Sequence, residues 1–222
     1  MKKTQLTNLI IVDASGSMGS KVDEVIGGLK QLFTQIEEDA IKDKKTVTSS
    51  TIVVDFSSSG DFRTLITSPD SLSLDHKLAE NYSTRGMTAL YDAISKGFSL
   101  VKGKQDSVFV NIITDGQEND SKEINGDVLK KLITKKKADN WVITFMGTTE
   151  QAVNSAVSMG VSLGNTMTFA DSAAGVHISM DKLSKVRSCH YSMSKQMLSP
   201  LSSDEKKREN KKKLDNLMKD ES

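Results

Sequence analysis

The stretch Leu9-Ile-Ile-Val-Asp-Ala-Ser-Gly-Ser-Met-Gly19 joins a short apolar run to a turn of small residues. Apolar side chains then recur from Val22 to Ile36 at a spacing that places them on one face of a helix. A strand that is apolar throughout and leads into an amphipathic helix is typical of a parallel sheet covered by helices. We therefore predict that residues 6–12 form a buried strand and that residues 13–20 form the turn into the first helix.

The same pattern of strand and helix continues to about residue 170. Residues 61–67 follow the turn Ser57-Ser-Ser-Gly60 and are expected to pair back on residues 51–56 as a hairpin. Residues 41–50 are rich in lysine and threonine and are interpreted as a loop. Further strands and helices are predicted, the strands at residues 108–113, 141–146 and 166–169, and the helices from residues 88, 124 and 150 onward. In the helix from residue 124, Val128 is expected to face inward. The sequence thus predicts one doubly wound α/β domain over residues 4–170.

The C-terminal segment differs in composition from this domain. Residues 171–200 carry a weak helical stripe of apolar residues and are predicted to form a helix packed on the edge of the domain. Residues 201–222 are densely charged with both signs and have few apolar side chains, so we expect a mobile, solvated tail. The alternative for this tail is a helix that binds a partner through the basic runs Lys206-Lys-Arg208 and Lys211-Lys-Lys213. Interspersed acidic residues weaken that basic face as a nucleic-acid patch.

The composition excludes several classes of protein. With 222 residues the chain is long enough to bury a real core, and its single cysteine cannot form an internal disulfide. One cysteine and three scattered histidines cannot form a Cys/His zinc site, so any metal would need oxygen ligands. The formal net charge of +1 gives no general reason to bind nucleic acid or an acidic membrane. The early apolar run at residues 9–12 is too short for a secretion signal or a membrane span, and we expect a cytoplasmic protein.

Five side chains with oxygen donors are predicted at the edge of the sheet where ligands bind in such folds. Asp13, Ser15 and Ser17 come directly after the first strand, Asp115 follows a later apolar strand, and Thr88 begins a helix. The alternation of the first three lets one extended turn point their oxygens toward one centre. Two carboxylates in one cleft repel each other unless a cation or a proton lies between them. Carboxylate, hydroxyl and water oxygens are the ligands that Mg²⁺ or Mn²⁺ prefers, so a divalent ion is predicted between Asp13 and Asp115.

Each of these residues also has a purely structural interpretation. Ser15, Ser17 or Thr88 would cap the helix that follows it, and Asp115 would belong to a turn of threonine, aspartate and glycine. The meeting of three separate segments at one sheet edge favours the metal site over these alternatives. Asp92 is predicted to lie on the surface of its helix, and Asn119 and Asp120 are predicted to lie in a loop, with contact to the ligands of the ion as the alternative. Arg85 is predicted to be a solvated loop residue, with contact to an acidic partner as the alternative.

Three motifs of the chain resemble those of a von Willebrand factor A domain and occur in that family's order. They are Asp13-Ala-Ser-Gly-Ser-Met18, Gly86-Met-Thr-Ala-Leu-Tyr-Asp-Ala93 and Ile113-Thr-Asp-Gly-Gln-Glu-Asn119. The resemblance covers residues 5–170 and is to the short, free-standing type found in prokaryotes and phages. It implies a Rossmann-like fold with a mostly parallel sheet, one antiparallel edge strand and helices on both faces.

The resemblance also implies a metal-ion-dependent adhesion site. In the family's pattern, Ser15, Ser17 and Thr88 correspond to hydroxyl ligands of the ion, and Asp13 and Asp115 correspond to carboxylates that act through bound water. The implied ion is Mg²⁺, with Mn²⁺ as a substitute, and its open position takes an acidic side chain from a protein partner. The resemblance therefore implies an intracellular, non-catalytic binding module, with an ATPase as one candidate partner.

An enzyme is the alternative function. The loop at residues 15–19 precedes a helix, and helix N-termini bind anions, so a phosphate-handling enzyme or a nucleotide binder is the competing hypothesis. The loop lacks the lysine of a P-loop and the third glycine of a dinucleotide-binding motif. No histidine follows a strand near a serine, and no Gly-x-Ser-x-Gly motif occurs. These observations favour the binding module.

Overall fold

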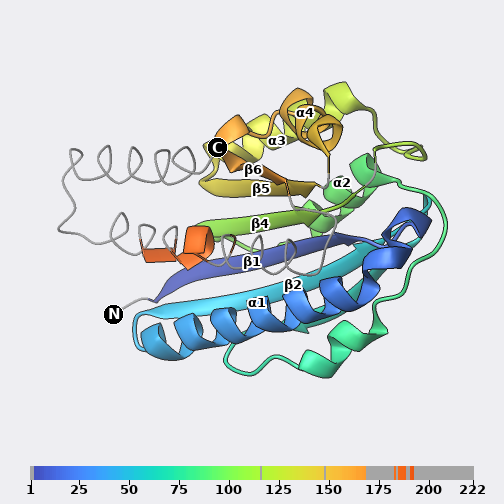
Figure 1. Ribbon diagram of the computed structural model, residues 1–222. Coiled ribbons are helices and arrows are strands. Elements are labelled where there is room, and N and C mark those ends of the chain that lie inside the picture. Colours follow the sequence, from blue (N-terminus) through green and yellow to red (C-terminus); the bar gives the residue numbers. More distant parts are fainter. Residues whose placement is uncertain are drawn as a thin grey trace.

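The computed structural model describes residues 3–115, 117–147, 149–168, 183, 185–188 and 191–192 (Figure 1). The strands in these residues are β1 (Thr4–Asp13), β2 (Val47–Phe56), β3 (Phe62–Ser68), β4 (Ser107–Ile113), β5 (Trp141–Gly147) and β6 (Thr166–Thr168). They form one sheet in the order β3-β2-β1-β4-β5-β6. β2 and β3 pair antiparallel, and all the other neighbouring strands pair parallel. The predicted α/β fold, with a mostly parallel sheet and one antiparallel edge strand, is confirmed.

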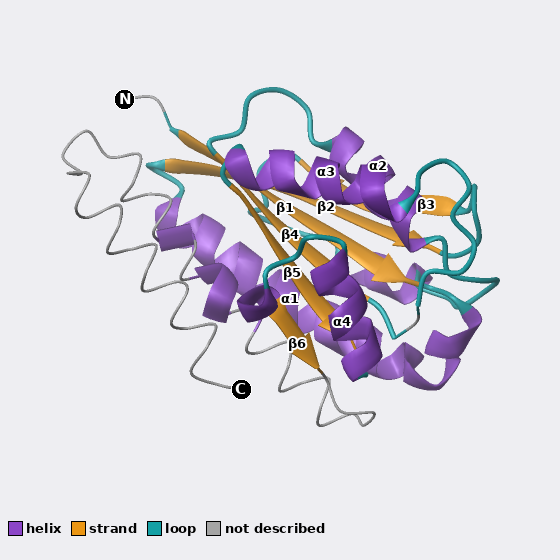
Figure 2. Ribbon diagram, turned by 90° about the horizontal axis from the view of Figure 1, so that it is seen from above, coloured by secondary structure: helices purple, strands orange, loops and turns teal. Residues whose placement is uncertain are grey.

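Helices cover both faces of this sheet. They are α1 (Val22–Asp43), α2 (Leu90–Leu100), α3 (Gly126–Ala138) and α4 (Glu150–Ser158), and short 3₁₀ turns occur at Gly16–Lys21, His76–Asn81 and Leu163–Asn165. α2, α3 and α4 pack into the core on one face, and α1 packs into the core on the other. Figure 2 shows α1 on one side of the strands and α2 and α3 on the opposite side.

The central strand β1 contributes to both cores. Leu9 and Ile11 pack on the side of α2, and Ile10 and Val12 pack on the side of α1. Successive residues of a strand point to opposite faces of the sheet. Because helices cover both faces, all four side chains are fully buried. Burying one such side chain contributes about 1.5–3 kcal/mol to the free energy of folding. The apolar run therefore stabilises β1 in the centre of the sheet, where helices cover both faces.

The prediction of a loop over residues 41–50 is wrong at both ends of that range. α1 continues to Asp43, and β2 begins at Val47. The polar start of β2 is stabilised by β1, since the side-chain amide of Asn8 donates to the hydroxyl of Ser49 at 3.1 Å. Residues 47–50 lack the apolar pattern from which strands were predicted, because polar contacts hold this part of β2 in place.

The buried face of α3 is narrower than predicted. Leu129 and Ile133 are fully buried, whereas Val128 is 47% exposed. The two buried residues are four positions apart and share one face of the helix. Val128 is turned away from Leu129 by about 100° around the helix axis, so the prediction that it faces inward is wrong.

The C-terminal segment is described only in part. Residues 183, 185–188 and 191–192 are helical, and Leu183 is fully buried in the core that α1 covers. The other residues of the predicted extension, and the whole of the predicted tail at residues 201–222, lie outside the described residues. The division of the chain at residue 170 therefore stays a prediction.

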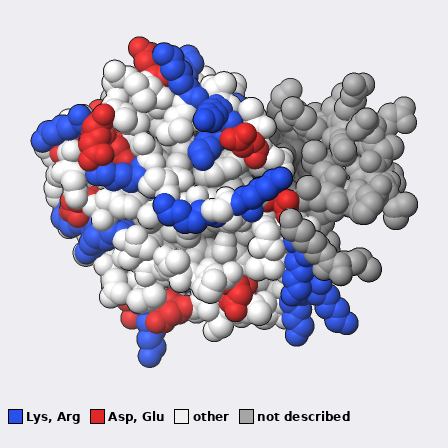
Figure 3. Space-filling view, turned by 180° about the vertical axis from the view of Figure 1, so that it is seen from behind, with Lys and Arg blue, Asp and Glu red and all other residues white. Residues whose placement is uncertain are grey.

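Charged side chains of both signs lie side by side on one face of the molecule. On the face seen in Figure 3, lysine and arginine side chains are interspersed with aspartate and glutamate side chains, as expected for a chain with a formal net charge of +1. Among the described residues, none of the helices combines the length and the apolar character that are needed to cross a membrane.

Candidate metal centre

The turn after β1 begins with a buried carboxylate. Asp13, the last residue of β1, is fully buried. Its Oδ1 atom accepts a hydrogen bond from the backbone N–H of Ser15 at 2.7 Å, and its Oδ2 atom accepts one from the Thr114 hydroxyl at 2.5 Å. Burial raises the pKa of Asp13 and the charge of Asp115 acts in the same direction, while the hydrogen bonds oppose both effects. A cation close to Asp13 would therefore stabilise its charged form.

A row of oxygen atoms joins the turn after β1 to the turn after β4. The hydroxyls of Ser15 and Ser17 lie 3.1 Å apart, and the Ser17 hydroxyl donates to Oδ1 of Asp115 at 2.7 Å. Ser17 and Asp115 are 98 positions apart in the sequence, and the parallel pairing of β1 with β4 brings them together. A serine that donates its hydroxyl proton keeps two lone pairs, so Ser17 can contact a cation while it holds Asp115 in place.

A lysine that the sequence analysis missed lies beside the same carboxylate. The Nζ atom of Lys21 is 2.9 Å from Oδ2 of Asp115, and the two side chains are only 11% and 6% exposed. Lys21 is the last residue of the 3₁₀ turn that follows Ser15. Sequence spacing carries no signal for this contact, because the two residues are 94 positions apart and most lysines lie at the surface.

The segment before α2 is held against both turns by its backbone. The Gly16 N–H donates to the Gly86 carbonyl at 3.1 Å. Thr88 is buried, and its N–H donates to the side-chain oxygen of Asn119 at 2.9 Å. The Thr88 carbonyl accepts hydrogen bonds from the N–H groups of Asn119 and Asp120 at 3.0 and 3.2 Å. These backbone contacts place Thr88 at the same edge of the sheet as the two turns.

Glycine is required at position 86 for two reasons. The backbone there has φ +60°, a conformation that residues with a Cβ atom rarely adopt. A Cβ atom at this position would also lie 2.5 Å from the hydroxyl oxygen of Ser58 and 3.2 Å from that of Ser57. A larger residue would therefore be strained in its backbone and would require the Ser58 hydroxyl to shift.

The prediction that Arg85 is a solvated loop residue is wrong. Its Nη2 atom lies 3.0 Å from Oδ1 of Asp55, and its Nε atom lies 2.6 Å from Oδ2 of Asp61. Asp55 is fully buried and also accepts a hydrogen bond from Nε of Arg63 at 2.9 Å. The hairpin register could have revealed part of this network, because Asp55 and Arg63 lie directly opposite each other on β2 and β3. The network fastens the segment before α2 to the hairpin.

Asp92, which was predicted to lie on a helix surface, is buried. Its carboxylate oxygens accept hydrogen bonds at 2.9–3.1 Å from consecutive backbone N–H groups, those of Lys122, Glu123 and Ile124. Burial would raise the pKa of Asp92, but these hydrogen bonds outweigh it and the pKa is lowered. Asp92 therefore anchors the loop after β4 onto α2.

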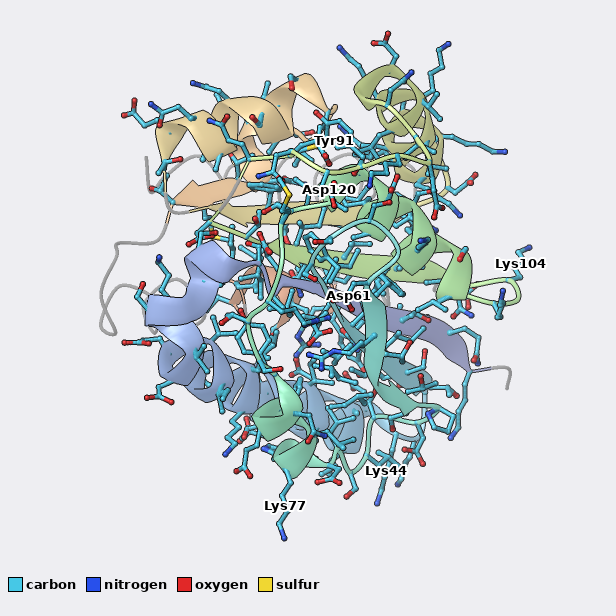
Figure 4. The ribbon with its side chains drawn as sticks, turned by 90° about the vertical axis from the view of Figure 1, so that its right-hand side faces the viewer. Lys44, Asp61, Lys77, Tyr91, Lys104 and Asp120 are labelled. Atoms are coloured by element: carbon cyan, nitrogen blue, oxygen red, sulfur yellow. The ribbon has the colours of Figure 1, made fainter. Side chains whose placement is uncertain are left out.

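Three more side chains of the loop after β4 accept hydrogen bonds from neighbouring segments. Asn119 and Asp120 are loop residues as predicted, and Asp120 accepts a hydrogen bond from the Ser59 N–H at 2.8 Å. Glu118 accepts one from the Tyr91 N–H at 2.8 Å, at the start of α2. Figure 4 faces this edge of the sheet, and its labels mark Tyr91 and Asp120 there. Three separate segments are thus fixed relative to one another at the candidate site.

The side chains at this edge fit a hard divalent cation. Asp13, Ser15, Ser17, Thr88 and Asp115 offer only carboxylate and hydroxyl oxygens. In the part of the chain that the structure describes, no group of three or more histidine, cysteine, aspartate or glutamate side chains could hold a metal ion. Coordination would therefore depend on hydroxyls and water as well as on carboxylates, and such ligands suit Mg²⁺ or Mn²⁺. The assignment of these five residues as a metal site stays a prediction.

No protein-family model and no curated protein matches the chain. Solved structures do match its fold. The vWF domain of the type V pili tip protein Mfa5 from Porphyromonas gingivalis has a TM-score of 0.64 at 9% sequence identity, and the match covers 85% of this chain and 96% of that one. The open conformation of the pilus adhesin SpaC from Lactobacillus rhamnosus GG has a TM-score of 0.61 at 14% identity, covering 83% of this chain and 30% of SpaC.

A third similar structure is that of a protein from the mussel byssus. Proximal thread matrix protein 1 (PTMP1) from the mussel byssus, with a zinc-occupied MIDAS motif, has a TM-score of 0.60 at 15% identity, covering 83% of this chain and 46% of PTMP1. The chain thus spans less than half the length of SpaC and of PTMP1. The sheet order, its antiparallel edge strand and these matches together show that the chain has the von Willebrand factor A fold.

Proposed function

We propose that the chain is a divalent-cation-dependent protein-binding module. Mg²⁺, with Mn²⁺ as a substitute, would be held at the carboxyl edge of the sheet by the hydroxyls of Ser15, Ser17 and Thr88, together with Asp13 and Asp115. The observation that carries the proposal is the hydrogen-bonded row from Asp13 through the two serines to Asp115. The zinc-occupied MIDAS motif of PTMP1 supports it, since PTMP1 has the same fold.

The charges of the site explain why a cation would bind. Asp13 is fully buried, so its charged form lacks the solvation that water would provide. The negative charge of Asp115 acts in the same direction on the pKa of Asp13, as expected for two carboxylates at one edge of a sheet. A bound Mg²⁺ would relieve the repulsion between the two carboxylates and offer an open position to an oxygen ligand.

The partner proposed for this position is a protein that presents an aspartate or glutamate side chain, because carboxylate oxygens are good ligands of Mg²⁺. An intracellular adaptor role, an ATPase as the partner and a cytoplasmic location are the further parts of the proposal, and they rest on the sequence resemblance. Immunoblotting of cell fractions would check the location. A partner captured with Mg²⁺ and released by a chelator would be tested by replacing its acidic residues with amides.

The competing hypothesis of a phosphate-binding loop is disfavoured by the hydrogen bonds of residues 15–19. The N–H groups of Ser15, Gly16 and Met18 already donate to acceptors within the protein, at 2.7, 3.1 and 3.0 Å. A phosphate-binding helix N-terminus needs N–H groups that point at the ligand. We therefore propose a non-enzymatic function for this loop.

Thermal melting with and without Mg²⁺ tests the proposal. At a free concentration of 100 times Kd, a ligand that binds only the folded state stabilises it by about 2.7 kcal/mol, which raises the Tm by several degrees. Ser17→Ala should remove this shift while the fold, checked by circular dichroism, is retained. Ser20→Ala is the matched control, because Ser20 is exposed in the same turn. A wild-type protein whose Tm does not respond to Mg²⁺ or Mn²⁺ would overturn the proposal.

A further inference from the structure

The ion pair of Lys21 and Asp115 places a cation of the chain itself at the candidate metal site. The two charged groups are 2.9 Å apart, and both side chains are nearly buried. Solvent screens such a pair much less than it screens an exposed one. Lys21 is therefore part of the electrostatics of the site, although it is not one of the five predicted ligands.

Both oxygens of Asp115 are engaged in this structure. Oδ1 accepts the hydroxyl proton of Ser17, and Oδ2 accepts a hydrogen bond from Lys21. The Ser17 contact can persist when a cation binds, because the hydroxyl donates to Asp115 and still has lone pairs to offer. The Lys21 contact is different, since an ammonium has three donors and no acceptor and its positive charge repels a metal ion.

We propose that Lys21 is an internal counter-cation that competes with the divalent ion for Asp115. This inference rests on the proposed metal-binding function. While the ammonium neutralises Asp115, the repulsion between Asp115 and Asp13 is smaller, so the fold tolerates two carboxylates at one edge. When a divalent ion binds, the ammonium must move away from Asp115 or share it. Its flexible four-carbon side chain permits such a movement.

The competition sets the affinity of the site for metal. Removing the ammonium takes one positive charge away from Asp115, which strengthens the attraction for a divalent ion, and it also removes the like charge that the ion would meet. For a unit charge at this separation in a partly screened site, we expect about tenfold tighter binding of the ion. The same removal should lower the Tm of the metal-free protein, because Asp115 loses its ion pair with Lys21.

Lys21→Met tests the inference, with Mn²⁺ affinity measured by titration calorimetry and by electron paramagnetic resonance of the free ion. Lys30→Met is the matched control, since Lys30 also forms an ion pair, with Glu80 at 2.7 Å, but on the exposed side of α1. We expect Lys21→Met to bind Mn²⁺ about tenfold more tightly than the wild-type chain. Lys30→Met should bind Mn²⁺ as the wild type does. Lys21→Arg, which keeps the charge, should bind at least as weakly as the wild type.

The outcomes separate this inference from the proposed function. Wild-type binding of Mn²⁺ together with equal or weaker binding by Lys21→Met would overturn the role of Lys21 and leave the metal site intact. An absence of Mn²⁺ binding in both chains would overturn the metal site itself, and the role of Lys21 with it. If Lys21→Met does not fold, as judged by circular dichroism, Lys21→Gln takes its place, because its amide can still donate a hydrogen bond to Asp115 without a charge.

Discussion

At the scale of single residues, the structure uses buried carboxylates to hold loops as well as to form the candidate metal site. Asp92 on α2 binds three consecutive N–H groups of the loop after β4, and Asp55 binds Arg63 and Arg85. Hydrogen bonds to a charged acceptor are among the strong ones in proteins. Asp55 therefore holds the segment that precedes Thr88, and Asp92 holds the loop after β4 against the helix that follows Thr88.

Replacing Asp92 with asparagine tests this role. An amide has one acceptor oxygen in place of two, so at least one of the N–H groups of Lys122, Glu123 and Ile124 loses its partner. We expect Asp92→Asn to lower the free energy of unfolding by about 2 kcal/mol at pH 7, measured by urea denaturation. Lys77→Met, at an exposed position, should leave it almost unchanged.

The effect of Asp92→Asn should depend on pH in a defined direction. The pKa of Asp92 is lower in the folded protein than its ordinary value of 3.8. The charged carboxylate therefore contributes full stability above this ordinary value, and the contribution is lost as the pH falls through the lower, folded-state pKa. The difference between the wild type and Asp92→Asn should narrow below the ordinary value. A difference that stays constant down to strongly acidic pH would contradict the assignment.

At the scale of elements, the approach of α4 to the end of β5 depends on a glycine. A Cβ atom at Gly147 would lie 2.7 Å from the Cβ atom of Ala152 on α4 and 3.2 Å from the Phe145 ring. α4 begins just after this point, where the Thr149 hydroxyl accepts a hydrogen bond from the Ala152 N–H at 3.1 Å. The helix cannot move away from the strand without losing the burial of Ala152.

Gly147→Ala is therefore expected to destabilise the protein by about 1–3 kcal/mol through overpacking. Ala152→Gly removes the atom with which the new side chain would clash, so the double variant should be less destabilised than the sum of the two single variants. Guanidinium denaturation of the four proteins would measure this coupling. Strictly additive effects would show that the contact does not limit the packing of α4.

At the scale of the whole molecule, a helical segment from the C-terminal part of the chain completes one of the two cores. Leu183 is fully buried in the core that α1 covers. Arg187, four residues further on, pairs with Asp39 and donates to the carbonyl of Gln35 at 3.1 Å. Through these contacts Arg187 binds α1 across about 150 positions of sequence. The segment that contains Leu183 and Arg187 therefore packs on the same face of the sheet as α1.

Leu183→Ala tests whether this segment stabilises the domain. Truncation of a fully buried leucine costs about 2–5 kcal/mol, and we expect a loss in this range in the free energy of unfolding. Val128→Ala is the control, because Val128 is an aliphatic residue that is 47% exposed on α3, and its effect should stay within about 0.5 kcal/mol. A negligible effect of Leu183→Ala would show that the core closes without this segment.

The amino-acid sequence by itself determined the fold class and most of the strands and helices, and it predicted the oxygen donors at the sheet edge. Periodicity located β1, β4 and β5, because burial on both faces requires apolar residues throughout a strand. It failed at residues 41–50, where polar contacts with β1 replace apolar burial. The positions of Asp13 and Asp115 directly after apolar strands predicted that both lie at one edge, since parallel strands end on the same side of a sheet.

Only the tertiary structure decided which carboxylates Lys21 and Arg85 meet. The order of the strands brings Lys21 to Asp115 across 94 positions, and it brings Arg85 to Asp55 across 30. Periodicity depends on neighbours in the sequence, whereas an ion pair depends on which loops the sheet places side by side. The electrostatic state of the candidate metal site therefore follows from strand order, because a residue without a sequence signal supplies the cation beside it.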